Sequence, residues 1–144
     1  MSVSLYGSGQ TVIQVVTGTT ATATSTTSTS FVATNLTASI TPQSTNSKIL
    51  VIVSSNGITN NAGYGGYFTI YRNNVTNLGG GTFSALNTIQ NYYYVPVVIS
   101  YLDSPSTTSA TTYTMYISAE SGTTNYGNTA RNTNTITLLE ISGS

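Results

Sequence analysis

The chain has 144 residues, in which three Lys or Arg balance three Asp or Glu, so that only 4% of residues are charged. An ordinary soluble domain carries about 25%. Nucleic-acid binding depends on clustered Lys and Arg, and three dispersed cations exclude a nucleic-acid partner. His and Cys are both absent, which removes the common general base, the usual zinc ligands and the thiol nucleophile.

The length is that of one domain. Residues 1–10 are aperiodic and contain Gly and Ser, so we expect an N-terminal arm there, followed by a single β-sandwich domain over residues 11–144. No run is long enough to cross a bilayer, and the N-terminus lacks the features of a signal peptide. We therefore expect no membrane partner and synthesis in the cytoplasm.

The first strand is predicted over Thr11 to Thr17, which is apolar on both sides. The Thr-rich tract 17–30 that overlaps its end has no side chain large enough to fill a core, and it indicates a solvated loop or an edge strand. A mucin-like stalk and a flat, ice-ordering threonine array are the alternatives. Ser30 to Ile40 alternates imperfectly and is closed by Thr41-Pro42.

Ser47 to Ser55 is the most continuous aliphatic run. Ile49, Val51 and Val53 share one face, and Leu50 and Ile52 share the other. This pattern predicts a central strand that is covered on both sides. Asn56-Gly57 after it indicates either a two-residue hairpin turn or the start of a longer surface loop.

Tyr67 to Arg72 predicts a further strand, and Asn73-Asn74 predicts a hairpin turn because both residues tolerate a positive φ. The hairpin ends at Gly79 to Gly81. The last strand is predicted over Asn134 to Ser142.

Tyr92 to Ala119 contains two long strand patterns of period two. Their odd positions are apolar and predict the core. We interpret them as two antiparallel core strands that are joined by a loop, with Asp103-Ser104-Pro105 as its turn. The predicted core residues are Val95, Val97, Ile99, Tyr113, Met115 and Ile117.

About eight short strands, and no usable helical period, predict an all-β protein. We expect an antiparallel two-sheet sandwich of the jelly-roll type.

The carboxylates Asp103, Glu120 and Glu140 do not form a catalytic pattern in the sequence, because a glycosidase requires two that flank one bond. We expect Asp103 to form a turn and Glu120 to be a solvated strand end. Glu140 shares a face with Leu138 and Ile136 and is expected to be partly buried, with Arg72, Arg131 or Lys48 as its partner. We therefore predict no catalytic, cofactor-binding or metal-binding residue, and no cofactor.

Tyrosine is enriched, with 11 Tyr and no Trp. Its ring and hydroxyl suit interfaces and sugar faces, while the alternative is ordinary cross-strand packing. The candidate contacts with a partner or a glycan are Leu5, Tyr6, Tyr64, Tyr67, Tyr92 and Tyr94.

Four segments carry a family resemblance: ITPQSTNSKILVIVSS, IYRNNVTNLGGG, SYLDSPSTTSATTYTMYIS and NTITLLEIS. Together they span most of residues 30–142. In content, order and spacing they resemble a β-sandwich domain that recurs in virion structural proteins of tailed bacteriophages, in tail fibres and head-surface proteins. The resemblance implies a non-enzymatic, trimeric component of the particle.

A short arm and one sandwich fit a capsid decoration, or cement, protein better than a fibre, which adds an attachment region and a shaft. We therefore expect a homotrimer that binds the major capsid protein on the virion surface and is made in the host cytoplasm. Its arm, residues 1–10, and the strand after it are expected to contact a neighbouring subunit, by strand addition. A tail- or head-fibre tip that recognises host-surface carbohydrate is the alternative. An enzyme such as a glycan hydrolase is the third hypothesis.

Overall fold

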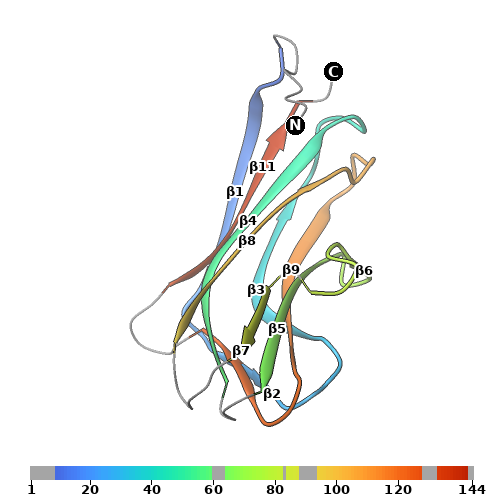
Figure 1. Cartoon of the computed structure of the whole chain (residues 1–144). Coiled ribbons are helices and arrows are strands. Elements are labelled where there is room, and N and C mark those ends of the chain that lie inside the picture. Colours follow the sequence, from blue (N-terminus) through green and yellow to red (C-terminus); the bar gives the residue numbers. More distant parts are fainter. Residues whose placement is uncertain (1–8, 60–63, 83, 88–93, 128–132, 143–144) are drawn as a thin grey trace, which may run out of the picture.

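The computed structural model describes residues 9–59, 64–82, 84–87, 94–127 and 133–142. These residues form two antiparallel sheets that face one another (Figure 1). Sheet A contains β1 (Val12–Thr20), β2 (Thr24–Thr26), β4 (Lys48–Thr59), β8 (Val95–Asp103), β10 (Thr124–Tyr126) and β11 (Asn134–Ile141). Sheet B contains β3 (Val32–Ile40), β5 (Gly65–Arg72), β6 (Thr76–Asn77), β7 (Ser84–Asn87) and β9 (Thr111–Ala119).

The long strands of the two sheets alternate along the chain. In sheet A, β11 lies between β1 and β4, and β8 pairs with the other side of β4; in sheet B, β9 lies between β3 and β5. Each long strand has one apolar face, so placing consecutive strands on opposite sheets buries these faces against each other. The predicted all-β, antiparallel two-sheet sandwich is confirmed, while the jelly roll stays a prediction.

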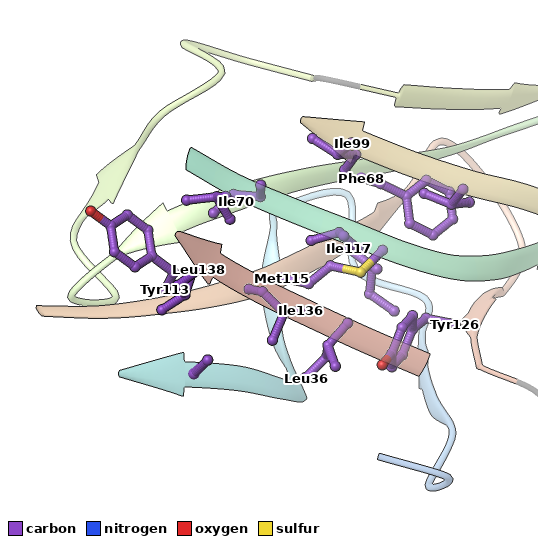
Figure 2. Close-up of a cluster of buried hydrophobic side chains, with 14 of the residues drawn as sticks. Leu36, Phe68, Ile70, Ile99, Tyr113, Met115, Ile117, Tyr126, Ile136 and Leu138 are labelled. Carbon is purple, nitrogen blue, oxygen red and sulfur yellow. The ribbon is translucent and has the colours of Figure 1, made fainter. Parts of the chain in front are cut away.

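The core consists of side chains that alternate along the strands and point between the sheets (Figure 2). The odd-numbered side chains of β4, Ile49, Val51 and Val53, are fully buried. Of the six residues predicted for the core, five are buried and Val95 packs against the cluster at its margin. The buried members from the remaining strands are Leu36, Ala38, Ile40, Phe68, Ile70, Val97, Ile99, Tyr113, Met115, Ile117, Tyr126, Ile136 and Leu138.

The prediction that the two strands of Tyr92 to Ala119 form an antiparallel pair is wrong. β8 pairs with β4 in sheet A, whereas β9 pairs with β3 and β5 in sheet B. The segment 104–110 crosses from one sheet to the other. Both strands present one apolar face, and these faces contribute to the same core from opposite sides.

Local turn patterns were reliable only where tertiary pairing did not override them. Asn73 and Asn74 have φ values of 52° and 56° and join β5 to β6, so the predicted hairpin is confirmed. Asn56-Gly57, in contrast, lies inside β4, and Gly57 pairs with both Tyr126 and Val95. The expected turn there is wrong because neighbouring strands on both sides hold the chain extended.

The Thr-rich tract forms the end of β1 and the short strand β2, which pairs with β10. This agrees with the edge-strand interpretation. β1 closes the sandwich against sheet B at Gly18, where a Cβ would collide with the carbonyl oxygen of Thr37. Glycine at this position lets the backbones of β1 and β3 approach.

Candidate functional surfaces

The side chain of Asp103 links the two sheets. Arg72 Nη1, from β5, donates to both carboxylate oxygens at 2.8 and 2.9 Å, and Tyr113 Oη, from β9, donates to Oδ2 at 2.7 Å. Asp103 and Tyr113 are buried, and Arg72 is partly buried. Burial, together with the hydrogen bond and the negative charge of Asp103, raises the pKa of Tyr113. The predicted role of Asp103 in a turn is corrected. Asp103 is the last residue of β8, and its carboxylate forms an ion pair with Arg72 of the other sheet.

Glu140 is completely buried at the same end of sheet A. Its Oε1 accepts the backbone N–H of Gln43 at 2.7 Å, and its Oε2 has no hydrogen-bond partner. The predicted burial is therefore confirmed. The predicted ion pair with Arg72 is wrong, since Arg72 is paired with Asp103; Lys48 is not its partner either, and Arg131 lies outside the described residues.

Glu120 is exposed directly after β9, as predicted, and its Oε2 accepts the backbone N–H of Gly65 at 2.7 Å. Asp103 and Glu140 both lie opposite Ile49, on either side of it, so two strand spacings, about 10 Å, separate their Cα atoms. Both point into the core. Across the described ranges, no three acidic side chains gather where they could hold a metal ion.

One pocket, of about 430 Å³, lies on sheet A where β8 and β11 begin beside β4. Its walls combine the ring of Tyr94, which is 55% exposed, with hydroxyl and amide side chains. Asn134 is already engaged, because it accepts from Ser55 Oγ at 2.9 Å and donates to the carbonyl oxygen of Thr20. The lining residues are Ser54, Ser55, Asn56, Tyr94, Val95, Pro96, Thr133 and Asn134, none of which is charged.

The structure separates the tyrosine candidates. Tyr94 lines the pocket, whereas Tyr64, 43% exposed, and the partly buried Tyr67 lie at the start of β5 in sheet B and do not line it. Leu5, Tyr6 and Tyr92 lie outside the described residues. The sequence analysis missed Tyr71 and Tyr116, whose rings stack at 4.0 Å on the outer side of sheet B.

The outer side of sheet A carries an aliphatic surface. Strand register sets Val15, Leu139, Leu50 and Leu102 side by side in one row that crosses β1, β11, β4 and β8. Val15 is 58% exposed and Leu102 is 47% exposed. We call this surface the aliphatic face of sheet A. The row beside it on the same side contains the hydroxyl side chains of Thr17, Thr137 and Ser100 next to Ile52. The apolar members of the face are Val12, Val15, Leu50, Ile52, Val98, Leu102, Leu139 and Ile141.

No described element covers the aliphatic face. Figure 1 shows that sheet B packs on the other side of sheet A, the side that faces the core. The expectation that the strand at Ser47 to Ser55 is covered on both sides is therefore corrected. Its inner residues are buried against sheet B, while Leu50 and Ile52 stay partly exposed on the outer side. A two-sheet sandwich needs only one apolar face from this strand, and the second apolar face, at Leu50 and Ile52, has no partner among the described residues.

The outer side of sheet B is different in chemistry. Its hydroxyls pair with each other across strands: Thr37 with Thr114 at 3.0 Å and Ser39 with Thr112 at 2.6 Å. Such cross-strand pairs stabilise a sheet surface, and Thr114 is itself only 5% exposed. The structure thus offers one apolar outer surface, one polar outer surface and one uncharged pocket.

Comparison with known proteins adds no family assignment: no protein-family model matches the chain, and no curated protein matches it. The described part of the chain also contains no helix that is long and apolar enough to span a membrane.

Proposed function

We propose that this protein is a non-enzymatic structural component of a bacteriophage virion, a homotrimeric decoration protein that binds the major capsid protein on the outer capsid surface. The resemblance of the four segments to a virion domain of tailed bacteriophages supports the assignment to a phage particle. The carboxylates support the non-enzymatic part, because Asp103 and Glu140 point into the core and the uncharged pocket contains none.

The observation that carries the proposal is the aliphatic face of sheet A. Its size is that of the largest apolar patch on a typical monomeric protein, about 300–600 Å², and such patches are often functional contacts. In a chain with three positive and three negative residues, little long-range repulsion opposes association. A decoration protein uses these properties directly, since its role is to stay bound to neighbours.

The proposal is tested by adding the purified protein to capsids that lack it, and by sedimenting the capsids. We expect stoichiometric co-sedimentation that persists at about 1 M salt, where the Debye length falls to about 3 Å, because six charged residues leave few ion pairs for salt to weaken. Failure to sediment with capsids at any salt concentration would overturn the proposal. Release at moderate salt would contradict a contact that depends little on charge.

A second candidate function, a fibre tip that binds host-surface carbohydrate, is favoured by the pocket at Tyr94. Sugar sites combine an aromatic ring with hydrogen-bonding groups, and a volume of 430 Å³ falls within the range of about 300–1,000 Å³ for small-molecule sites. The absence of charge from the described lining favours a neutral sugar.

This candidate is tested on a glycan array with the wild-type protein and two variants. Tyr94→Ala should abolish binding, while Tyr64→Ala, which changes an exposed tyrosine outside the pocket, should leave it intact. No reproducible binding by the wild-type protein would remove the candidate.

A further inference from the structure

We propose that the aliphatic face of sheet A, continued over the free edge of β1, is the contact between copies of this chain. The inference rests on the proposed homotrimer and assigns the surface that forms it. The occupant to which it commits is a second copy, rather than the capsid.

The geometry of the face is the first argument. The row from Val15 to Leu102 runs from β1 to β8, and both strands are edges of sheet A in the described structure. Four strands at about 4.8 Å, and some seven residues at about 3.4 Å, give a face of about 460 Å². That is about half of the roughly 800 Å² that each partner contributes to a standard interface. The contact therefore has to extend beyond the face.

The edge of β1 is the natural continuation. Its sequence, VIQVVTGTT, contains no charged residue and no proline, although edge strands are normally protected from pairing by such residues. Its one bulge, between Val12 and Gln14, is a device that discourages edge pairing, but it is confined to the start of the strand and leaves Val15 to Thr20 regular. Face and edge together present apolar side chains and free backbone groups to the same neighbour.

The charges are the argument for a second copy. Among the described outward-facing positions of β1, β11, β4 and β8, Lys48 alone is charged, and it lies at the border of the face. Three copies can therefore bring this face together around a threefold axis with only Lys48 charged at its border. Closed self-association would also cover the β1 edge in every copy, which prevents open-ended strand pairing.

The test measures molar mass in solution for the wild-type protein and variants at the two ends of the row, Val15→Lys and Leu102→Lys. The matched control is Val75→Lys, because Val75 is 80% exposed but lies in the turn between β5 and β6 of sheet B. We expect three copies for the wild type and the control. Each row variant should raise the dissociation constant at least about 100-fold, since burying an unpaired ammonium group is strongly unfavourable.

Circular dichroism checks that the variants keep their β-structure. If a lysine variant does not fold, Val15→Thr retains the β-branched shape and should still weaken the trimer. Folded row variants that remain trimeric would overturn the inference. So would a monomeric wild type, even if Val15→Lys then lost capsid binding, because the face would belong to the capsid. A trimer that needs the face but does not bind capsids would leave this inference standing and overturn the proposed function.

Discussion

The outer surfaces of the two sheets differ, although both belong to strands with the same period of two. On sheet B the outward positions carry hydroxyl pairs and the stacked rings of Tyr71 and Tyr116. On sheet A they carry the aliphatic row that includes Leu50 and Leu139. Sheet A also has such a hydroxyl pair, Thr17 with Thr137 at 3.4 Å, but its aliphatic row has no partner among the described residues. This difference is the reason for which we propose sheet A as the contact surface.

The largest expected effect compares two adjacent leucines of β11. Leu138 is fully buried and Leu139 belongs to the aliphatic face. Leu138→Ala should lower the free energy of unfolding by about 3 kcal/mol, because it leaves a cavity in the core. Leu139→Ala should lower that of the monomer by less than about 1 kcal/mol but weaken the trimer. Denaturant titration at low protein concentration measures the stability of the monomer, and a molar-mass measurement reports the trimer. Equal losses of monomer stability in the two variants would contradict the distinction between the inner and outer sides of sheet A.

An alkaline titration distinguishes the inner tyrosines from the outer ones. Burial is the main cause that raises the pKa of both Tyr113 and Tyr126. The hydroxyl of Tyr126 makes no hydrogen bond, and its neighbour Ser55 lowers the pKa by less than burial raises it. A raised pKa in the folded state means that the stabilisation is complete below about pH 10, the value for the unfolded chain, and is lost as the pH rises further.

We therefore expect the free energy of unfolding to fall by up to about 1.4 kcal/mol per pH unit for each of the two tyrosines above pH 10. Urea denaturation at a series of alkaline pH values measures this slope. Tyr113→Phe should reduce this slope by the contribution of one tyrosine, up to about 1.4 kcal/mol per pH unit. A slope that does not change in this variant would show that Tyr113 ionises without unfolding.

A smaller effect is expected from Tyr116 on the outer side of sheet B. Tyr116→Ala removes the stacking on Tyr71 at 4.0 Å and should lower the free energy of unfolding by about 1 kcal/mol. The molar mass of the assembly should stay unchanged, because the surface of sheet B is not the proposed contact. Loss of the trimer in this variant would reverse the roles of the two sheets.

The sequence predicts the faces of the strands better than their partners. Period two in Val95 to Tyr101 and Tyr113 to Ile117 identified the core side, because alternation is a local property. The pairing of β8 with β4 instead of β9 depends on residues about fifty positions apart, which no local pattern contains. The same reason explains why Asn56-Gly57, predicted to be a hairpin turn or the start of a longer loop, lies inside β4.

The candidate surfaces were predictable to different degrees. The apolar pattern on both sides of Ser47 to Ser55 predicted cover on both faces, whereas the described structure covers only the inner one. The pocket combines Tyr94 with Ser54 and Thr133 from separate strands, so composition alone could propose Tyr94 and could not separate it from Tyr64. The link from Arg72 to Asp103 joins two sheets and equally required the fold.

Electron microscopy of intact particles is the most direct test of the central proposal, because it locates the protein and resolves its neighbours. The proposal predicts trimers on the outer capsid surface, in which the aliphatic face of sheet A and the edge of β1 lie between copies. Density for this sandwich only at a fibre tip, with the Tyr94 pocket directed outward, or its absence from the particles, would contradict the account.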